Sequence, residues 1–382
     1  MPPIVTTLTD VARDIWLDSF AVGPGDVPMK SPAAWSIRKR TLRGGLRDGV
    51  DLVDVDNGAL SFSILPTRGM GMWRGRYRGI SLGWQSPVVG PVHPQFVSLG
   101  DRHGLGWLTG FDEWLCRCGL HSMGAPGDDN GFPLNLHGRI ANSPAHKVEV
   151  VVDPDAPLLG VTGEVEEGGL FYPHLRLSTS MTTALRSNAI TIVDSVENRS
   201  AKPVEIEVLC HLNNGPPLLE AGSRIRMPVS EVTPMTKWAA EGIGDWNVCA
   251  GPVAGFAERV YCCVPAAGAD GRTLAVLHDA AGGKGLAIHW DVKQMPCCSL
   301  WKNTAAVEDG YVVGLEPATS FPQHRSKERA AGRVPTLSPG GTWQARWTIE
   351  VYDDAEAVAK AIAKVDQIQS GVKSVVRREP LM

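Results

Sequence analysis

Three short segments place ionisable side chains inside apolar or glycine-rich stretches. They are Leu136-His137-Gly138-Arg139, Leu209-Cys210-His211-Leu212-Asn213-Asn214 and Val313-Gly314-Leu315-Glu316-Pro317. Imidazole and carboxyl groups are the side chains that most often transfer protons in enzymes. The Glu316 carboxylate is either paired in the interior, with Lys302 as a candidate partner, or held for chemistry. These segments indicate general acid/base catalysis, provided that the fold brings them together.

Two histidines are candidates for the second proton-transfer group. His211 follows the alternating run Val204, Ile206 and Val208 and precedes a polar stretch, so we expect it near the end of a strand. His137 stands beside Gly138 and Arg139, which would offer a donor, a fixed cation and a close backbone approach to a ligand. A lone strand histidine is more often a structural residue than a catalyst, and both interpretations stay open.

The stretch from Gly83 to Gly138 is long, rich in proline and glycine, and unusual for a compact domain. It also carries several aromatic and histidine side chains, which suit the flat faces and hydroxyls of a carbohydrate: Trp84, Trp107, Trp114, His93, His103, His121 and His137. We expect this stretch to form part of a binding surface, although for any single tryptophan a core position is the favoured interpretation.

The elements that must position these groups are mostly strands. Alternating apolar residues predict hairpins around the turns at 56–58, 187–188 and 282–285, and a strand from Trp343 to Val351. Apolar residues at three- and four-residue steps predict a terminal helix over 354–370. A second helix is expected from Asp10 to Phe20. We expect an all-β domain over residues 1–382, with residues 1–45 as an N-terminal extension.

Composition excludes several functions. The 37 Lys and Arg residues are outnumbered by 41 Asp and Glu residues, so there is no excess of positive charge for a nucleic acid. No stretch approaches the roughly 20 apolar residues that would span a bilayer, and no leader pattern opens the chain. We therefore expect a cytoplasmic protein. The eight cysteines have no zinc-ribbon spacing and are expected to be buried, reduced thiols.

The order of several motifs resembles the galactose mutarotase-like superfamily, in particular an uncharacterised aldose 1-epimerase-like branch. The resemblance spans most of the chain and rests on Leu65-Pro66-Thr67-Arg68-Gly69-Met70, Gly83-Trp84-Gln85-Ser86-Pro87, Cys118-Gly119-Leu120-His121, His137-Gly138-Arg139, His211-Leu212-Asn213-Asn214-Gly215 and Gly314-Leu315-Glu316-Pro317. It implies an antiparallel β-supersandwich that holds a sugar on a concave sheet.

The resemblance also implies roles for particular residues. Glu316 is expected to be the base that takes the proton of the anomeric hydroxyl, and His211 the acid that protonates the ring oxygen. The expected substrate-binding residues are His137, Arg139, Arg68, His121, Asn213, Trp301 and Lys302. Either arginine could hold the ring oxygen or a neighbouring hydroxyl. No metal or organic cofactor is implied.

The sequence departs from the well-studied epimerases at two motifs. Their His-Thr-Tyr-Phe-Asn run is replaced by residues 211–215, and Pro317 follows the glutamate where those enzymes have Gln. The aspartate that binds sugar hydroxyls in those enzymes has no motif here, although Asp245 and Glu258 fall in the corresponding region.

Two further hypotheses keep the same fold. In the first, His121, His137, His211 and Glu316 bind a divalent cation and support a sugar lyase or isomerase reaction. In the second, the domain binds carbohydrate without catalysis, because a shared fold does not guarantee shared chemistry. A symmetric homodimer is the default expectation for assembly.

Overall fold

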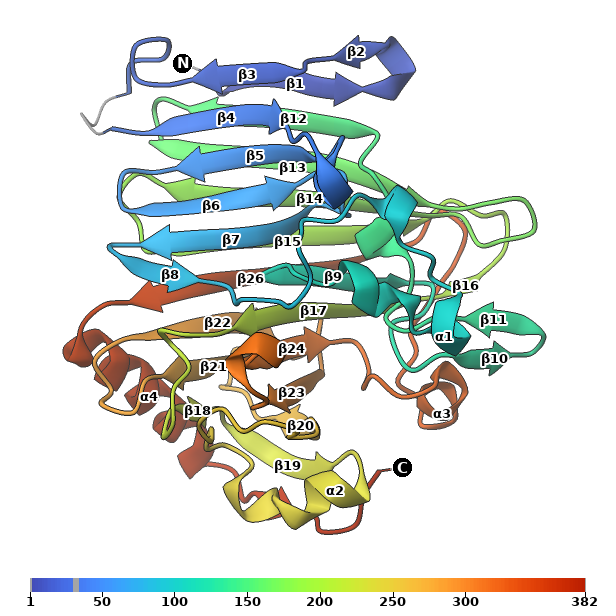
Figure 1. The fold of residues 1–382 in the computed structure, drawn as a ribbon, viewed down its shortest axis with the longest axis vertical. Coiled ribbons are helices and arrows are strands. Elements are labelled where there is room, and N and C mark those ends of the chain that lie inside the picture. Colours follow the sequence, from blue (N-terminus) through green and yellow to red (C-terminus); the bar gives the residue numbers. More distant parts are fainter. Residues whose placement is uncertain (1, 30–33, 382) are drawn as a thin grey trace.

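Alternation of apolar and polar residues produces two large antiparallel sheets that pack face to face (Figure 1). The structure is a computed structural model, and it describes residues 2–29 and 34–381. A single large cluster of buried side chains fills the space between the sheets, with Trp114, Trp290 and Trp347 among its largest members. The predicted all-β sandwich is thereby confirmed.

The first sheet has thirteen strands and carries the three candidate segments or the loops beside them. In spatial order its strands are β27 (Val375–Val376), β19 (Val229–Pro234), β20 (Arg259–Pro265), β23 (Cys297–Asn303), β24 (Val312–Ala318), β17 (Glu207–Asn214), β9 (Leu115–Leu120), β7 (Gly71–Tyr77), β6 (Leu60–Leu65), β5 (Asp51–Asp56), β4 (Ser36–Thr41) and β3 (Ser19–Val22), with β8 (Ile80–Leu82) paired to β7.

The second sheet has ten strands and lies behind the first in Figure 1. Its order is β18 (Arg224–Arg226), β21 (Arg272–His278), β22 (Gly285–Asp291), β26 (Thr342–Tyr352), β15 (Ala189–Asn198), β14 (Leu175–Ala184), β13 (Leu158–Glu167), β12 (Lys147–Asp153), β1 (Ile4–Asp10) and β2 (Ile15–Trp16). Two short pairs stand apart: β10 (Gly127–Asp129) with β11 (Phe132–Leu134), and β16 (Val204–Glu205) with β25 (Thr336–Leu337).

Helices are few and lie outside the sandwich. They are α1 (Asp101–Gly104), α2 (Lys237–Glu241), α3 (Arg325–Ala330) and α4 (Ala355–Ser370). The predicted terminal helix corresponds to α4, which the Asp354 carboxylate caps and which packs Val358, Ala361 and Val365 against β21 and β26. Within the described ranges, no helix has the length and apolar character needed to cross a membrane.

The three hairpins expected from the sequence are confirmed. Strands β5 and β6, β14 and β15, and β21 and β22 pair as antiparallel neighbours around the predicted turns. The Trp343–Val351 strand is the central part of β26, which joins β15 to β22. Each of the eight cysteines is buried and free, as expected.

The helix expected from Asp10 to Phe20 is wrong. This segment contains the end of β1, a single 3-10 turn at Val11–Arg13, β2 and the start of β3. The Asp10 carboxylate accepts a hydrogen bond from the Arg13 amide, and Asp14 adopts a left-handed φ of 56°, which reverses the chain instead of continuing a helix. Strands formed by residues 4–10 and 36–41 extend the two sheets, since β1 pairs with β12 and β4 pairs with β5.

A buried ion pair joins the two sheets behind the candidate segments. Arg117 of β9 donates to the Asp194 carboxylate of β15 at 2.9 Å, and both side chains are almost fully buried. Thr179 of β14 accepts from the same guanidinium, and the indole of Trp347 donates to the other Asp194 oxygen. The pair is fully hydrogen-bonded, so losing one partner would leave an uncompensated charge in the core.

We predict that Asp194→Asn lowers the free energy of unfolding by about 3–5 kcal/mol, because the volume is kept while Arg117 loses its counter-charge. Urea unfolding measures the effect. The control is Glu197→Gln on the same strand, which removes an exposed pair with Arg199 and should cost less than about 1 kcal/mol. Equal losses in both variants would show that the buried pair is not an essential link between the sheets.

Candidate active site

A cavity of about 330 Å³ lies on the face of the thirteen-stranded sheet that points away from the sandwich core. Strands β17, β20, β23 and β24 form its floor, and the segments 105–111 and 136–137 cover it. Its lining is mostly apolar and comprises Leu105, Trp107, Leu108, Phe111, Leu136, His137, His211, Met235, Glu258, Val260, Trp301, Glu316 and Pro322. Four of the residues predicted from the sequence as sugar-site residues therefore meet here: His137, His211, Trp301 and Glu316.

His211 and Glu316 come together through the pairing of β17 with β24. The register joins Asn213 to Gly314 and Leu212 to Leu315, which places the two side chains next to each other on the same face. The distance from His211 Nε2 to Glu316 Oε1 is 3.3 Å. A Cβ atom at Gly314 would lie 2.4 Å from that carboxylate oxygen. Glycine at 314 is therefore a condition for this contact.

Burial controls the protonation of both groups. The side chains of Glu316 and His211 are only 3% and 5% exposed. Loss of solvation raises the pKa of Glu316 well above its usual range, and the nearby Glu258 charge adds to this effect. Burial also lowers the pKa of His211 well below its usual range, with a further contribution from His137, whereas Asn213 opposes the shift. Burial therefore favours the neutral form of both groups, with Glu316 as the carboxylic acid and His211 as the uncharged imidazole.

His137 approaches the pair from the loop that follows β11. Its backbone has a φ of 58°, a left-handed conformation that is uncommon for a residue with a side chain. The ring nitrogen Nδ1 lies 2.9 Å from the carbonyl oxygen of Met123, and the ring stands edge-on to His211 with centroids 5.4 Å apart. Burial lowers the pKa of His137 to about 4, although the Met123 contact opposes the shift. A neutral His137 with Nδ1 protonated leaves Nε2 free to accept a hydrogen bond.

Aromatic side chains surround the histidines. Phe111 contacts His211 edge-on at 5.0 Å between centroids, and Trp301 contacts it at 5.3 Å. The indole of Trp301 donates a 2.6 Å hydrogen bond to Glu258, an exposed residue at the rim. The combination of aromatic faces with a few fixed polar groups suits a small polar ring with apolar faces.

Five predicted binding residues do not line this cavity, and three of them have their polar groups bound elsewhere in the fold. The Arg68 guanidinium is buried and bound to Glu113, the Val92 carbonyl and Asn142. Lys302 follows Trp301 on β23 and thus points to the opposite face, where it donates to the carbonyls of residues 245, 246 and 248. Asn213 shares the His211 face, but its amide nitrogen donates to the backbone carbonyls of residues 113 and 211.

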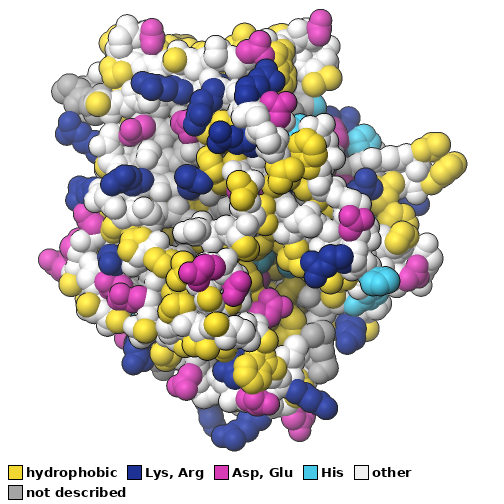
Figure 2. Space-filling model, in the orientation of Figure 1, with side chains coloured by type: hydrophobic (Ala, Val, Ile, Leu, Met, Phe, Trp, Pro, Cys, Tyr) yellow, Lys and Arg dark blue, Asp and Glu magenta, His cyan; other side chains and the backbone are white. Residues whose placement is uncertain are grey.

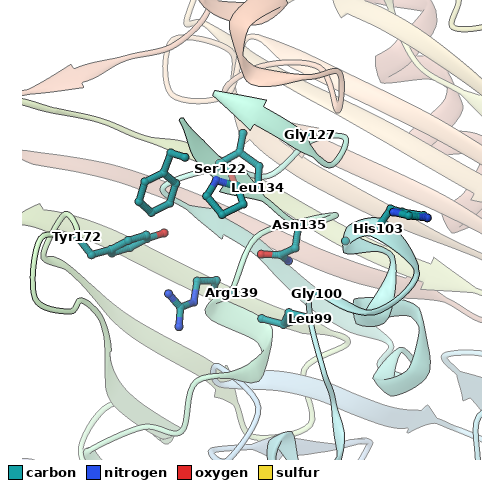
Figure 3. A pocket seen from close by; sticks show the side chains of 12 residues that line it. Leu99, Gly100, His103, Ser122, Gly127, Leu134, Asn135, Arg139 and Tyr172 are labelled. Atoms are coloured by element: carbon teal, nitrogen blue, oxygen red, sulfur yellow. The ribbon is translucent and has the colours of Figure 1, made fainter. Parts of the chain in front are cut away.

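Arg139 belongs to a second cavity of about 560 Å³, shown in Figure 3. There it lies beside Tyr172, with its guanidinium 5.2 Å from the ring centroid, and Asn135 also lines the space. His121 lies next to this cavity, in ring contact with Tyr172 and at 2.7 Å from Arg325. Gly138 packs against the backbone of Ser122 and Gly119, so it serves the fold of the loop instead of exposing backbone to a ligand.

The two cavities lie on opposite sides of one wall. Leu105, Leu136 and His137 line the first cavity, whereas Gly104, Asn135 and Arg139 line the second. The Leu136 amide donates to the Gly104 carbonyl at 2.8 Å and ties the two segments of the wall together. The side chains of the 137–139 segment are thereby divided between two sites.

Sequence reasoning did not assign Phe111, Met235 or Leu108 to the site, and it named Glu258 without a role. Phe111 and Leu108 belong to the long 83–138 stretch, whose composition did indicate a binding surface. Glu258 precedes β20 in a stretch without any motif, so only the tertiary structure reveals its position.

The four residues considered as metal ligands do not form one group. His137, His211 and Glu316 line the first cavity, but His121 lies beside the second. Across residues 2–29 and 34–381, no three His, Cys, Asp or Glu side chains are grouped in a way that could hold a metal ion.

Comparison with known proteins identifies the fold. A solved structure from Klebsiella pneumoniae, described as a "putative aldose 1-epimerase", has a TM-score of 0.97 at 33% identity and covers 100% of this chain and 99% of its own. A galactose mutarotase-like protein from Clostridium acetobutylicum has a TM-score of 0.58 at 14% identity, covering 83% and 98%. A galactose 1-epimerase from Lactobacillus acidophilus has a TM-score of 0.55 at 10% identity, covering 88% and 99%. The last two share the fold alone.

The profile of the family described as "Domain of unknown function (DUF4432)" matches residues 47–351. No curated protein matches the sequence. The chain belongs to the DUF4432 family, and it has the fold of the galactose mutarotase-like proteins that the resemblance predicted.

We predict that Glu316→Gln stabilises the protein above pH 4.5. In wild type the folded state retains the Glu316 proton at pH values where the unfolded state has lost it, so stability falls as pH rises from 4.5 through the raised pKa. Glutamine removes this penalty without changing the volume. Urea unfolding at several pH values should show a difference that grows with pH and then levels off.

The matched control is Glu356→Gln, an exposed change on α4. A Glu316→Gln variant that is less stable than wild type at every pH would contradict the account, since it would mean that an ionised Glu316 is stabilised in the folded state.

Proposed function

We propose that the protein is an aldose 1-epimerase-like isomerase that interconverts the α and β anomers of a sugar. The observation that carries the proposal is the contact between two buried, ionisable side chains, Glu316 and His211, on the floor of an apolar cavity of monosaccharide size. The similarity to the Klebsiella protein over the full chain supports the same assignment.

Mutarotation requires one proton to leave the sugar while another arrives. Glu316, as carboxylate, takes the proton of the anomeric hydroxyl, and the C1–ring oxygen bond breaks to give the aldehyde. His211, protonated, gives its proton to the departing ring oxygen. Rotation about the C1–C2 bond then presents the other face of the aldehyde. On closure the ring oxygen attacks C1, Glu316 returns its proton to the carbonyl oxygen and His211 recovers its own.

Neutral Glu316 and neutral His211 together contain the same number of protons as the catalytic form, in which Glu316 is ionised and His211 is protonated. Moving one proton from Glu316 to His211 converts one form into the other. His211 Nε2 and Glu316 Oε1 lie 3.3 Å apart without a hydrogen bond between them, so this transfer requires a small reorientation of the side chains when the sugar binds. Sugar hydroxyls that hydrogen-bond to the carboxylate favour the ionised form, because a charged acceptor makes stronger hydrogen bonds than a neutral one. Substrate binding thus prepares the base.

The remaining groups suit binding and orientation. His137 offers Nε2 beside the pair, and Glu258 offers a carboxylate at the rim, where Trp301 holds it. Trp107, Phe111 and Trp301 cover the apolar faces of a sugar ring and exclude water from the reacting atoms.

We predict that wild type accelerates anomer exchange and that Glu316→Gln slows it by about 10²–10⁴-fold, the usual contribution of a general acid or base. NMR saturation exchange over a panel of aldoses measures the rate above the uncatalysed background. Glu356→Gln, far from the cavity on α4, should match wild type. Equal rates for wild type and Glu316→Gln would exclude Glu316 as the base, and no acceleration of any sugar would refute the proposed function.

The pH dependence of kcat/KM follows from the protonation of Glu316 and His211, which must hold one transferable proton between them during catalysis. Activity should fall on the acid side only well below pH 6.5, where His211 and Glu316 both become protonated and no base remains. It should fall on the alkaline side well above pH 4.5, where the pair loses its last proton and no acid remains. Initial rates between pH 4 and 10 measure the profile. An acid limb centred near pH 6.5, as for an exposed imidazole, would contradict the pairing.

A further inference from the structure

The catalytic cavity has no cationic side chain in its lining. Among the described residues that line it, the charged or ionisable ones are His137, His211, Glu258 and Glu316. The three cations expected from the sequence are turned elsewhere: Arg68 is paired with Glu113, Lys302 faces the other side of β23, and Arg139 lines the second cavity. Figure 2 shows many of the Lys and Arg side chains of this face over strands β4 to β7, with hydrophobic side chains nearer its centre.

An anionic sugar would therefore meet the Glu258 carboxylate and no permanently charged cation. Glu258 stands at the rim and already receives its one strong donor from Trp301. A second carboxylate or a phosphate placed in the cavity would be partly desolvated beside like charge, which disfavours binding.

The polar side chains are also too few for a fully hydroxylated sugar. Glu316 and His211 engage the anomeric hydroxyl and the ring oxygen. That leaves Nε2 of His137, the Glu258 carboxylate and the buried, unpaired indole N–H of Trp107 for all other hydroxyls. The Trp107 ring contacts the His137 ring, with centroids 4.6 Å apart, so these two groups serve the same part of the sugar. An aldohexose pyranose carries four more hydroxyls. The remaining walls are hydrocarbon: Leu105, Leu108, Leu136, Met235, Val260 and Pro322. A hydroxyl that points at these walls loses water without gaining a partner.

We propose that the cavity selects an uncharged, deoxygenated monosaccharide with about two hydroxyls beyond the anomeric one, such as a 2-deoxypentose or a dideoxyhexose. The methylene or methyl groups of such a sugar lie against the aliphatic walls, and its two hydroxyls reach His137 and Glu258. The volume of about 330 Å³ is at the small end for ligand pockets and fits a single sugar ring. This inference rests on the proposed function for the orientation of the ring.

The test compares matched sugars by isothermal titration calorimetry with the wild-type protein: ribose with 2-deoxyribose, and glucose with 2-deoxyglucose, 2,6-dideoxyglucose and glucuronate. We expect 2-deoxyribose and 2,6-dideoxyglucose to bind at least about tenfold more tightly than their parent sugars, a ratio equivalent to ~1.4 kcal/mol. Glucuronate should bind more weakly than glucose. Equal affinities within each set, or tighter binding of glucuronate, would overturn the inference.

A pair of variants locates the selectivity. Leu108 lines the cavity and is 38% exposed, so Leu108→Asn adds a polar group without burying it. It should narrow the gap in binding affinity between glucose and 2,6-dideoxyglucose by several-fold. Val89 is 84% exposed and does not line the cavity, and Val89→Asn should leave the gap unchanged. A gap that is unaffected by Leu108→Asn would overturn the assignment of selectivity to the apolar wall.

Anomer exchange measured on the same sugars separates this inference from the proposed function. Selective binding of deoxygenated sugars without faster exchange refutes the isomerase and supports the selectivity. Faster exchange without any preference supports the isomerase and refutes the selectivity. Binding of none of these sugars refutes both.

Discussion

The central constraint of this structure is the burial of a carboxyl and an imidazole side by side in an apolar cavity. Neither Glu316 nor His211 can hold a charge there at low cost, so burial favours the neutral form of both groups. That arrangement requires Gly314, whose missing side chain leaves room for the carboxylate, and it requires a cover that excludes water. The burial that lowers the stability of the folded protein also suits the two side chains to proton transfer.

The strands of the sandwich hold Glu316 and His211 in these positions. The β17–β24 register fixes the pair, and β23 adds Trp301 from the neighbouring strand on the same face. Behind β17, the Arg117–Asp194 pair ties β9 to β15 and thus joins the floor of the site to the opposite sheet. His137 comes instead from a loop and adopts a left-handed backbone, so its position depends on the Met123 carbonyl and on the close packing of Gly138.

Part of the floor could be predicted from the sequence, because the family resemblance joins Glu316 to His211, whereas strand alternation alone leaves the face of His211 ambiguous. Glu316 and His211 were indicated by their apolar surroundings, and the hairpins by their turns. Trp301 and Lys302 were both expected at the site, yet neighbours on a strand point to opposite faces, so only one could reach it. The separation of Arg139 from His137 could not be predicted, since it depends on loop conformation. The error at 10–20 has a similar origin, because local turn geometry at Asp14 outweighed a weak helical pattern.

The most direct test is a crystal structure of the Glu316→Gln variant with a bound deoxygenated aldose. The account predicts the sugar in the cavity lined by Trp107, Phe111 and Trp301, with its anomeric hydroxyl beside residue 316 and its ring oxygen beside His211. A sugar bound in the second cavity beside Arg139 and Tyr172, with the first cavity empty, would contradict the account.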